Sequence, residues 1–234
     1  MNLFRDALAW LTDPEQWTGP GNLLERIGEH AWYSLVALLI SALVAVPLGY
    51  LVGHTGRGKQ LVVGLSGAGR ALPSLGLLTV LTLLVGVGDA LLAATVVFVV
   101  LGIPSVLAGA YAGVENVDRV VVDAARAQGM THWQVLTRVE APLGLPLLVG
   151  GLRNAALQII ATAVLAAYVG LGGLGTYIQR GISLQRYDEM LGAALVIVVL
   201  ALVVDGVFAL IARLAVRASG ARGRLGDVVP TEGR

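Results

Sequence analysis

The strongest constraint on the fold is a set of five long apolar stretches. They occupy residues 31–52, 60–88, 90–114, 142–168 and 190–212 of the 234-residue chain. A helix needs about 20 residues to cross the hydrocarbon core of a bilayer, and each stretch is at least that long. The pattern predicts an all-α integral membrane protein with about five transmembrane helices. Pro73 leaves a second interpretation open, in which 60–88 forms two shorter pieces and the chain has six segments.

Composition excludes several other classes of protein. Hydrophobic residues make up 56% of the chain and charged residues 13%, against about 45–50% and about 25% in an ordinary soluble domain. A soluble enzyme is therefore excluded. The 16 basic and 15 acidic residues nearly cancel, so no field would attract nucleic acid. The chain lacks cysteine, and His30, His54 and His132 lie too far apart in sequence to suggest a cluster. We expect neither a metal site nor a catalytic site.

The distribution of basic residues predicts how the spans are oriented. Five spans place three basic segments on one side: the turn 54–59, the segment 115–142 and the region after residue 212. Short cytoplasmic connections are enriched in lysine and arginine. The first 30 residues hold two arginines and five acidic residues. We therefore expect a multi-pass protein of the cell membrane with its N-terminus outside and its C-terminus in the cytoplasm. Six spans would break this agreement.

The ends of the chain differ from its middle. We expect residues 1–30 to form an extracytoplasmic or interfacial segment, 31–214 the transmembrane domain and 215–234 a disordered cytoplasmic tail. Apolar residues near the N-terminus share one helical face, which favours a short helix in the outer membrane interface, with Trp10 among its interfacial aromatic residues. A frayed terminus is the alternative.

Two glycine-rich motifs resemble nucleotide-binding sequences only in part. The segment 53–59 matches the first seven positions of a P-loop, but Gln60 stands where serine or threonine would bind magnesium. The segment 170–175 matches a dinucleotide fingerprint, yet it follows an apolar span instead of a strand. We interpret both segments as turns at the ends of membrane helices.

The segment 115–142 is the one long polar connection between spans. Asp118 is a natural N-cap for a helix over 120–128, which Gly129 can end in the left-handed conformation. Thr131 and Gln134 have the spacing of a capping box, so a second short helix begins there. The alanines at 124, 125 and 127 would give the first helix a small-residue face that fits a groove on another protein. A plain amphipathic connector is the alternative.

This segment resembles the "EAA" loop of ABC-importer permeases. The likeness rests on Asp123-Ala124-Ala125 followed by Gly129, with Pro142 and Pro146 downstream. Further motifs resemble the glycine betaine/choline/carnitine branch of that family, and the likeness extends over roughly residues 31–211. They are 71–75, 129–134, 139–143, 151–155, 161–175 and 192–194. One departure is Asp123, where the family usually has glutamate.

The resemblance implies the type I fold of ABC-importer permeases and a pore-forming transport subunit instead of an enzyme. It implies three partners besides the lipid bilayer: a separate ATPase subunit, a second permease chain in a homodimer or heterodimer, and an extracytoplasmic substrate-binding protein. The ATPase binds ATP, so no cofactor is expected here. By position, the residues of the ATPase-coupling loop are Asp123, Ala124, Ala125, Gly129, Met130, Thr131 and Trp133, and Trp133 is a candidate anchor at the headgroup level.

The branch also implies a class of substrate. It carries quaternary-ammonium osmoprotectants, namely glycine betaine, choline, carnitine or proline betaine, into the cell. Such cations usually bind in aromatic cages, and aromatic residues are 6% of this chain. Tight recognition is therefore expected in the binding protein. Three alternatives remain: a permease for another small polar solute such as an amino acid, a secondary transporter, or a membrane-embedded hydrolase.

Ionisable and polar residues inside the spans are candidates for function because each is costly in lipid. We expect Arg153 and Asp205 to form an intramembrane ion pair, and Arg70 to bind carbonyl groups freed near Pro73; a gate or substrate contact is the alternative for each. Five residues are candidates for the translocation pathway or, alternatively, for hydrogen bonds between helices. They are Pro73, Ser74, Asn154, Gln158 and Thr162.

Overall fold

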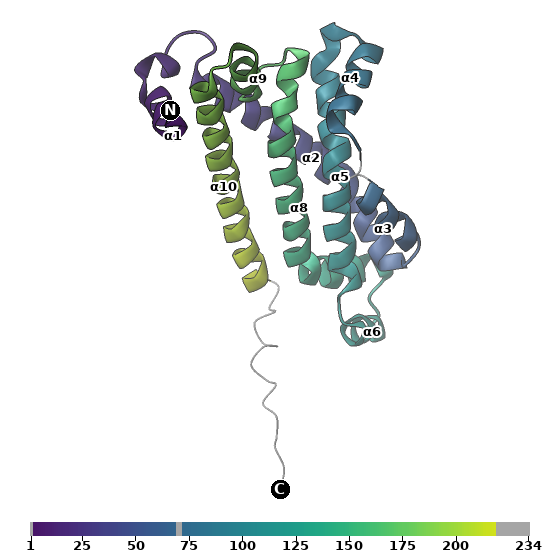
Figure 1. Cartoon of the computed structure of the whole chain (residues 1–234). Coiled ribbons are helices and arrows are strands. Elements are labelled where there is room, and N and C mark those ends of the chain that lie inside the picture. Colours follow the sequence, from purple (N-terminus) through teal and green to yellow (C-terminus); the bar gives the residue numbers. More distant parts are fainter. Residues whose placement is uncertain (1, 69–71, 219–234) are drawn as a thin grey trace.

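A computed structural model describes residues 2–68 and 72–218, which form helices and turns without strands. Four spans are long and apolar enough to cross a membrane: Leu23–Thr55, Val87–Glu115, His132–Val169 and Tyr187–Arg217. They are built around the long helices α2 (Leu23–Thr55), α5 (Ala90–Glu115), α8 (Ala141–Ala163) and α10 (Tyr187–Ala218). Figure 1 shows α5, α8 and α10 side by side with α2 crossing behind them. The fold class predicted from the sequence is confirmed.

The second apolar stretch is not one continuous helix. It forms α3 (Lys59–Ala68) and α4 (Ser74–Val85), and Pro73 precedes the first residue of α4. Pro73 has extended backbone angles (φ −71°, ψ 94°) at the N-cap of α4, and a proline disfavours the helical conformation of the residue before it, so a new helix begins after Pro73. Both pieces pack on α5, α3 near the end that bears α6 and α4 near the opposite end (Figure 1). The stretch that the sequence left open as one segment or two thus contains two short helices, α3 and α4.

The expectation for Arg70 lies outside the residues that the structure describes. The same holds for most of the expected tail, because α10 continues to Ala218 and the described part of the chain ends there.

The N-terminal segment is helical and attached to the bundle. Helix α1 (Leu3–Thr12) leads into a 3-10 turn, η1 (Pro14–Trp17), and α2 begins at Leu23, ahead of the start expected at residue 31. Trp10 is 5% exposed and packs edge-on against Tyr177, with 5.2 Å between the ring centroids. The assignment of Trp10 as an interfacial aromatic residue is therefore wrong: Trp10 fixes α1 to α9 and α10.

Glycines let the central helices approach closely. A Cβ atom on Gly151 of α8 would lie 2.8 Å from the Cα atom of Gly109 on α5, and one on Gly113 would lie 2.6 Å from the carbonyl oxygen of Gly144. Backbone contact of this kind is typical of transmembrane helix pairs with small residues at their interface. The α5–α8 pair is therefore a tightly packed centre of the fold, and α2 covers it with Gly49 facing α5.

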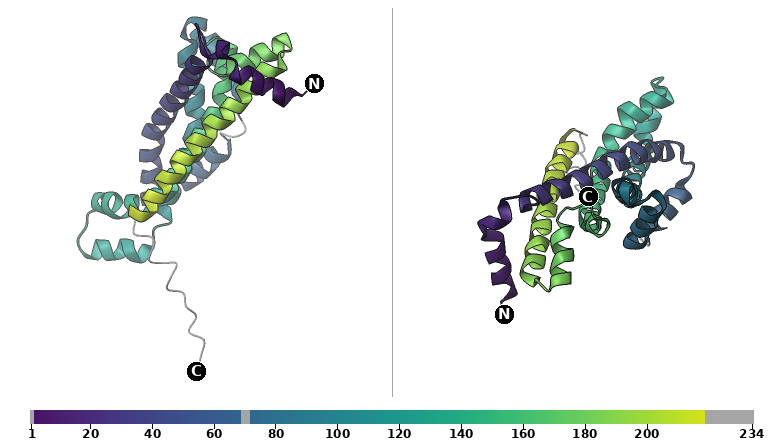
Figure 2. Two further views of the ribbon diagram at one scale, coloured as in Figure 1. Left: turned by 90° about the vertical axis from the view of Figure 1, so that its left-hand side faces the viewer. Right: turned by 90° about the horizontal axis from the view of Figure 1, so that it is seen from above.

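Shorter elements close the two ends of the bundle. At one end, η2 (Val87–Asp89) joins α4 to α5, and η4 (Val164–Val169) with α9 (Gly175–Leu184) joins α8 to α10. At the other end lie α6 (Arg119–Ala127), α7 (His132–Val135) and a π-helical turn, η3 (Leu136–Glu140), that runs into α8. Figure 2 shows α1 and the described end of α10 at opposite ends of the molecule.

The two glycine-rich motifs lie in turns, as expected. Residues 53–55 complete α2, and Gly56 and Gly58 have positive φ angles in the turn to α3. Gly170, Gly172 and Gly173 have positive φ angles in the turn between η4 and α9. Neither motif lies between a strand and a helix among the residues that the structure describes.

Candidate functional site

The connection between α5 and α8 folds as a helix, a glycine turn and a second helix, as the sequence predicted. The side chain of Asp118 accepts a hydrogen bond from the Val120 amide at 3.0 Å and caps α6. Gly129 has a φ of 83°, in the left-handed region that favours glycine. The Thr131 amide donates to Gln134 Oε1 at 2.8 Å and the Gln134 amide donates to Thr131 Oγ1 at 3.3 Å, which completes the capping box of α7.

A small apolar core holds this loop together. Val122 and Ala125 of α6 are buried against Val117 and Val135, with Met130 packed at the edge. Ala125 is 7% exposed, so this residue of the expected coupling loop supports α6 from beneath and does not lie on its outer surface. The result is a stiff protrusion at one end of the bundle (Figure 1).

The outer surface of the loop carries most of the other expected coupling residues. The exposed ones are Asp123, Ala124, Gly129, Thr131 and Trp133. Val120 is also 73% exposed, although the sequence analysis did not single it out. An exposed valine beside alanine and a carboxylate forms a mixed apolar and acidic surface, which suits docking to another protein.

A buried carboxylate at the base of the loop was missed from the sequence. Glu140, in η3, is fully buried, and its carboxylate is hydrogen-bonded to Nδ1 of His54 at the end of α2. The other ring nitrogen of His54 lies 3.3 Å from Nδ1 of His132 in α7. The statement that the histidines do not cluster is therefore wrong for His54 and His132. These three residues tie α2, α7 and η3 together directly beneath the protruding loop.

Polar residues of α8 lie on one face of that helix. Asn154, Gln158 and Thr162 follow each other at intervals of four residues, which places them in one row. Asn154 is exposed and the other two are partly exposed, and Thr162 Oγ1 donates to the Gln158 carbonyl at 2.8 Å. No hydrogen bond from the Asn154 or Gln158 side-chain amide occurs among the described residues. A row of polar groups at membrane depth needs water or a second protein chain beside it.

Pro73 and Ser74 do not join this polar row. They lie at the start of α4, and α5 packs between α4 and α8 (Figure 1). Pro73 marks the break between α3 and α4, and Ser74 begins α4.

The structure brings Arg153 and Asp205 together, as the sequence analysis expected. The guanidinium donates from Nε to Oδ1 at 2.5 Å and from Nη2 to Oδ2 at 2.6 Å, a bidentate arrangement. The pair joins α8 to α10 within the transmembrane part of the bundle. Both side chains remain partly exposed on the chain itself, at 40% for Arg153 and 28% for Asp205.

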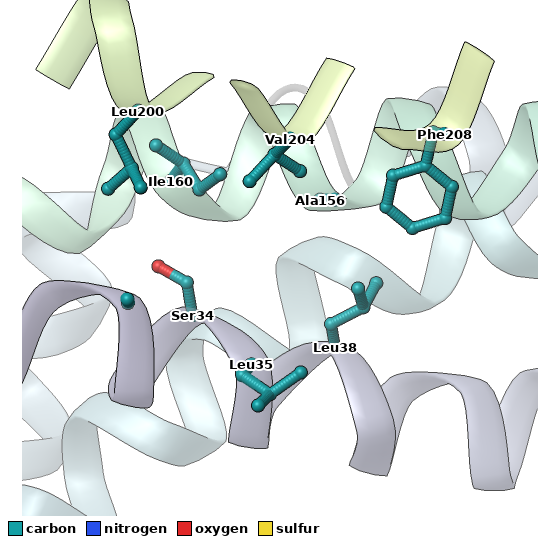
Figure 3. A pocket seen from close by; sticks show the side chains of 9 residues that line it. Ser34, Leu35, Leu38, Ala156, Ile160, Leu200, Val204 and Phe208 are labelled. Atoms are coloured by element: carbon teal, nitrogen blue, oxygen red, sulfur yellow. The ribbon is translucent and has the colours of Figure 1, made fainter. Parts of the chain in front are cut away.

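An apolar pocket between α2, α8 and α10 lacks the features of a substrate site. Figure 3 shows Leu35 and Leu38 of α2 facing Leu200, Val204 and Phe208 of α10 across the pocket. The Ser34 hydroxyl also lines it and already donates to the His30 carbonyl at 2.8 Å. A small polar solute would therefore find little to orient it there.

This arrangement, a bundle of apolar helices with a stiff protruding loop at one end and a polar row on a central helix, defines a membrane permease subunit. The family described as "Binding-protein-dependent transport system inner membrane component" matches residues 45–217. The chain belongs to this family.

Three similar proteins are transport permeases named for glycine betaine, carnitine or choline. The chain is 34% identical to the glycine betaine/carnitine/choline transport system permease protein OpuCB of Bacillus subtilis, over 84% of this chain and 89% of that protein. It is 36% identical to the carnitine transport permease protein OpuCB of Listeria monocytogenes, over 79% of this chain and 84% of that protein. The choline transport system permease protein OpuBB of Bacillus subtilis is 33% identical, with 84% and 89% covered.

Solved structures share the fold. A structure of the MetNI methionine ABC transporter in an inward-facing conformation matches with a TM-score of 0.73 at 21% identity, over 87% of this chain and 99% of the matched chain. An amino acid ABC transporter with histidines matches with a TM-score of 0.65 at 16% identity, over 81% and 92%. The type I importer-permease fold is thereby confirmed.

Proposed function

We propose that this permease translocates a quaternary-ammonium osmoprotectant, such as glycine betaine, choline, carnitine or proline betaine, into the cell. The observation that carries the proposal is the identity of 33–36% over most of the chain to permeases named for glycine betaine, carnitine and choline. The polar row Asn154, Gln158 and Thr162 on α8 supplies neutral hydrogen-bonding groups to the pathway. Such groups suit a small polar solute and would not trap a cation.

The proposed partners fit the two ends of the molecule. A separate ATPase subunit binds the loop surface around Val120, Asp123 and Ala124, and this ATPase, not the permease, binds and hydrolyses ATP. An extracytoplasmic binding protein delivers the substrate to the end formed by α1 and α9. A second permease chain completes the pore beside the polar row of α8. The permease itself needs no cofactor.

The helical connection behind the loop explains how movement of the ATPase would reach the pore. Helix α7, the π turn η3, α8 and the 3-10 segment η4 follow one another without a break and form one helical rod that spans His132–Val169. The core of Val122, Ala125 and Val135 and the pair of His54 with Glu140 stiffen the base of this rod. A push on α6 is therefore transmitted to the polar row of α8 instead of being absorbed by a flexible loop.

Reconstituted transport tests the substrate. The permease and its ATPase are reconstituted in liposomes, with ATP enclosed in the lumen on the side of the ATPase domains. The binding protein and the substrate are added outside. We expect ATP-dependent movement of radiolabelled glycine betaine, choline or carnitine, and no movement of methionine or histidine. Amino-acid transport without transport of any quaternary ammonium compound would contradict the proposal.

The orientation can be tested directly because the chain has no native cysteine. We expect cysteine placed at Thr18 to react with an impermeant maleimide in whole cells, and cysteine at Gln128 to react only after permeabilisation. Both positions are exposed and lie in segments at opposite ends of the bundle, and the basic segments should be cytoplasmic. Labelling of both cysteines from the same side, or in the reverse order, would refute the proposed orientation.

Replacing Gly129 should uncouple the permease from its ATPase. We expect Gly129→Val to reduce ATP-dependent transport at least tenfold while the protein remains in the membrane, because an L-residue in the left-handed region costs about 1–2 kcal/mol and a β-branched one more. A Cβ atom at Gly129 would meet no atom within 4 Å, so the effect is conformational and confined to the turn.

Gln128→Val is the matched control for this change. Gln128 is exposed and has an ordinary φ of −79°, so valine there should leave transport nearly unchanged. The measurements are uptake, ATPase co-purification and abundance in the membrane. Normal transport by Gly129→Val would show that the turn is not needed for coupling.

A further inference from the structure

Two adjoining hollows at the α6 end of the bundle differ sharply in chemistry. The first is lined by His54, Thr55, Arg57, Arg126 and His132. The second is lined mainly by apolar side chains, among them Pro47, Leu51, Trp133 and Leu136. The first hollow, which we call the basic hollow, thus holds two arginines and two histidines. The second, which we call the apolar groove, has scarcely any polar surface.

The two hollows lie next to each other along one face of α2. Pro47, Tyr50 and Leu51 line the apolar groove, and His54 and Thr55 line the basic hollow. These five residues follow the spacing of a single face of α2. On the opposite wall, His132 belongs to the basic hollow and its neighbour Trp133 to the groove. The two hollows therefore adjoin between α2 and the α7–η3 segment, the apolar groove along α2 and the basic hollow at its end, and we refer to the two together as the cleft.

The charges of the basic hollow are only partly balanced within the chain. His54 is paired with the buried Glu140, and Arg126 lies 3.9 Å from Asp123, which is a weak contact at the surface. Arg57 is exposed and forms no ion pair with an acidic residue in the described part of the chain. The hollow therefore offers two guanidinium groups to an anion.

We propose that this cleft binds one anionic phospholipid, with its phosphate in the basic hollow and an acyl chain in the apolar groove. Basic pockets at the cytoplasmic ends of transmembrane helices are suited to anionic headgroups. Trp133 is 71% exposed beside the groove, as expected for a side chain at the headgroup level. A water-soluble ATPase can reach the arginines but cannot fill a groove that extends along α2 to Val46.

A lipid bound in this cleft would also affect the position of the coupling loop. Its phosphate would join Arg57, in the turn after α2, to Arg126 on α6, and its chain would pack on the π turn that leads into α8. A bound lipid would therefore hold α6 at a fixed position relative to α2. This inference goes beyond the proposed transport function and does not depend on which solute is carried.

Lipid titration of the purified full-length chain in detergent tests the proposal. We expect dioleoyl-phosphatidylglycerol to raise the thermal unfolding midpoint and to stay bound in native mass spectrometry, whereas dioleoyl-phosphatidylcholine should do neither. The double variant Arg57→Gln, Arg126→Gln should weaken the binding about thirtyfold, since each basic side chain near an anionic headgroup contributes roughly fivefold. The control Arg119→Gln, Arg138→Gln removes two arginines of the same segment that line neither hollow and should bind normally.

Two further measurements show whether the acyl chain and the phosphate both contribute to binding. Thr137→Trp narrows the apolar groove at an exposed position and leaves the arginines in place, so it should weaken phosphatidylglycerol binding while the protein stays folded. Glycerol phosphate alone should have no effect at the same concentration. Three results would overturn the proposal. They are equal stabilisation of the protein by phosphatidylglycerol and phosphatidylcholine, stabilisation by glycerol phosphate alone, and undiminished stabilisation of the Arg57→Gln, Arg126→Gln variant by phosphatidylglycerol. Unchanged lipid binding with lost ATPase co-purification in that variant would assign the basic hollow to the ATPase.

Discussion

Leucine in place of Gly151 should remove the folded permease from the membrane, while leucine in place of its neighbour Gly150 should not. A Cβ atom at Gly151 would lie 2.8 Å from both Gly109 Cα and the Ser105 carbonyl oxygen, whereas one at Gly150 would meet nothing within 4 Å. The atoms in the way at Gly151 belong to the backbone of α5, so no rotamer change relieves the clash and the two helices must separate. Overpacking in a well-packed core costs about 1–3 kcal/mol and occasionally more; we expect the upper end or beyond here.

Membrane abundance and heat stability of fluorescently tagged protein measure this effect. Gly150→Leu controls for the change in side-chain size on the same turn of the same helix. Gly151→Ala gives an intermediate point, because its gain of about 1 kcal/mol in helix propensity opposes the clash. Equal abundance of Gly150→Leu and Gly151→Leu would show that α5 and α8 do not meet at their glycines.

Features that depend on near neighbours in the sequence could be predicted well. The capping box of Thr131 and Gln134 and the glycine turn at 129 involve residues within a few positions of one another, and each has a geometric requirement that few residue types satisfy. The break at Pro73 is also local, although sequence alone left one helix or two open. The helix boundary at Leu23 was harder, because the extra turns before residue 31 carry several polar residues and are held by distant partners: Leu23 packs in the cluster of Tyr177, and Glu29 accepts a hydrogen bond from the Gly173 amide.

Contacts between distant segments were predictable only where few partners existed. Arg153 and Asp205 lie 52 positions apart, but each is the single charged residue of its apolar stretch, so a pairing between them was a natural hypothesis. Glu140 and His54 lie 86 positions apart, each at the edge of a span. Polar residues are common at such edges and can be hydrated there, so the sequence offered no reason to pair these two. The apolar neighbours of Glu140, Val139 and Ala141, were the one signal that this carboxylate is buried.

The place of Trp10 shows a similar limit. A tryptophan near a predicted membrane surface is usually interfacial, and nothing in residues 1–30 indicates otherwise. Its burial depends on Gly192 of α10, which leaves room for the indole ring, and on Tyr177 of α9, against which the ring packs. Tertiary structure therefore overrides the local pattern, and α1 becomes a part of the bundle.

Removing one charge of the Arg153–Asp205 pair should destabilise the permease far more than removing both. Arg153→Met leaves a carboxylate, and Asp205→Leu leaves a guanidinium, at the depth of the membrane without the bidentate partner seen in the structure. A charge without a partner is costly in lipid, and replacing a whole ion pair by apolar residues of similar size is often neutral or stabilising. We expect each single variant to lose most of its membrane abundance and the double variant Arg153→Met, Asp205→Leu to recover it.

Transport by the double variant then separates two roles of the pair. Recovery of both abundance and ATP-dependent uptake would mean that the pair only fixes α8 to α10. Recovery of abundance without uptake would mean that one of the two charges also acts in the pathway, which their partial exposure beside the polar row of α8 allows. Because the two side chains are in direct contact, their effects should be strongly non-additive. A double variant less abundant than either single variant would show that the two residues do not depend on each other in the membrane.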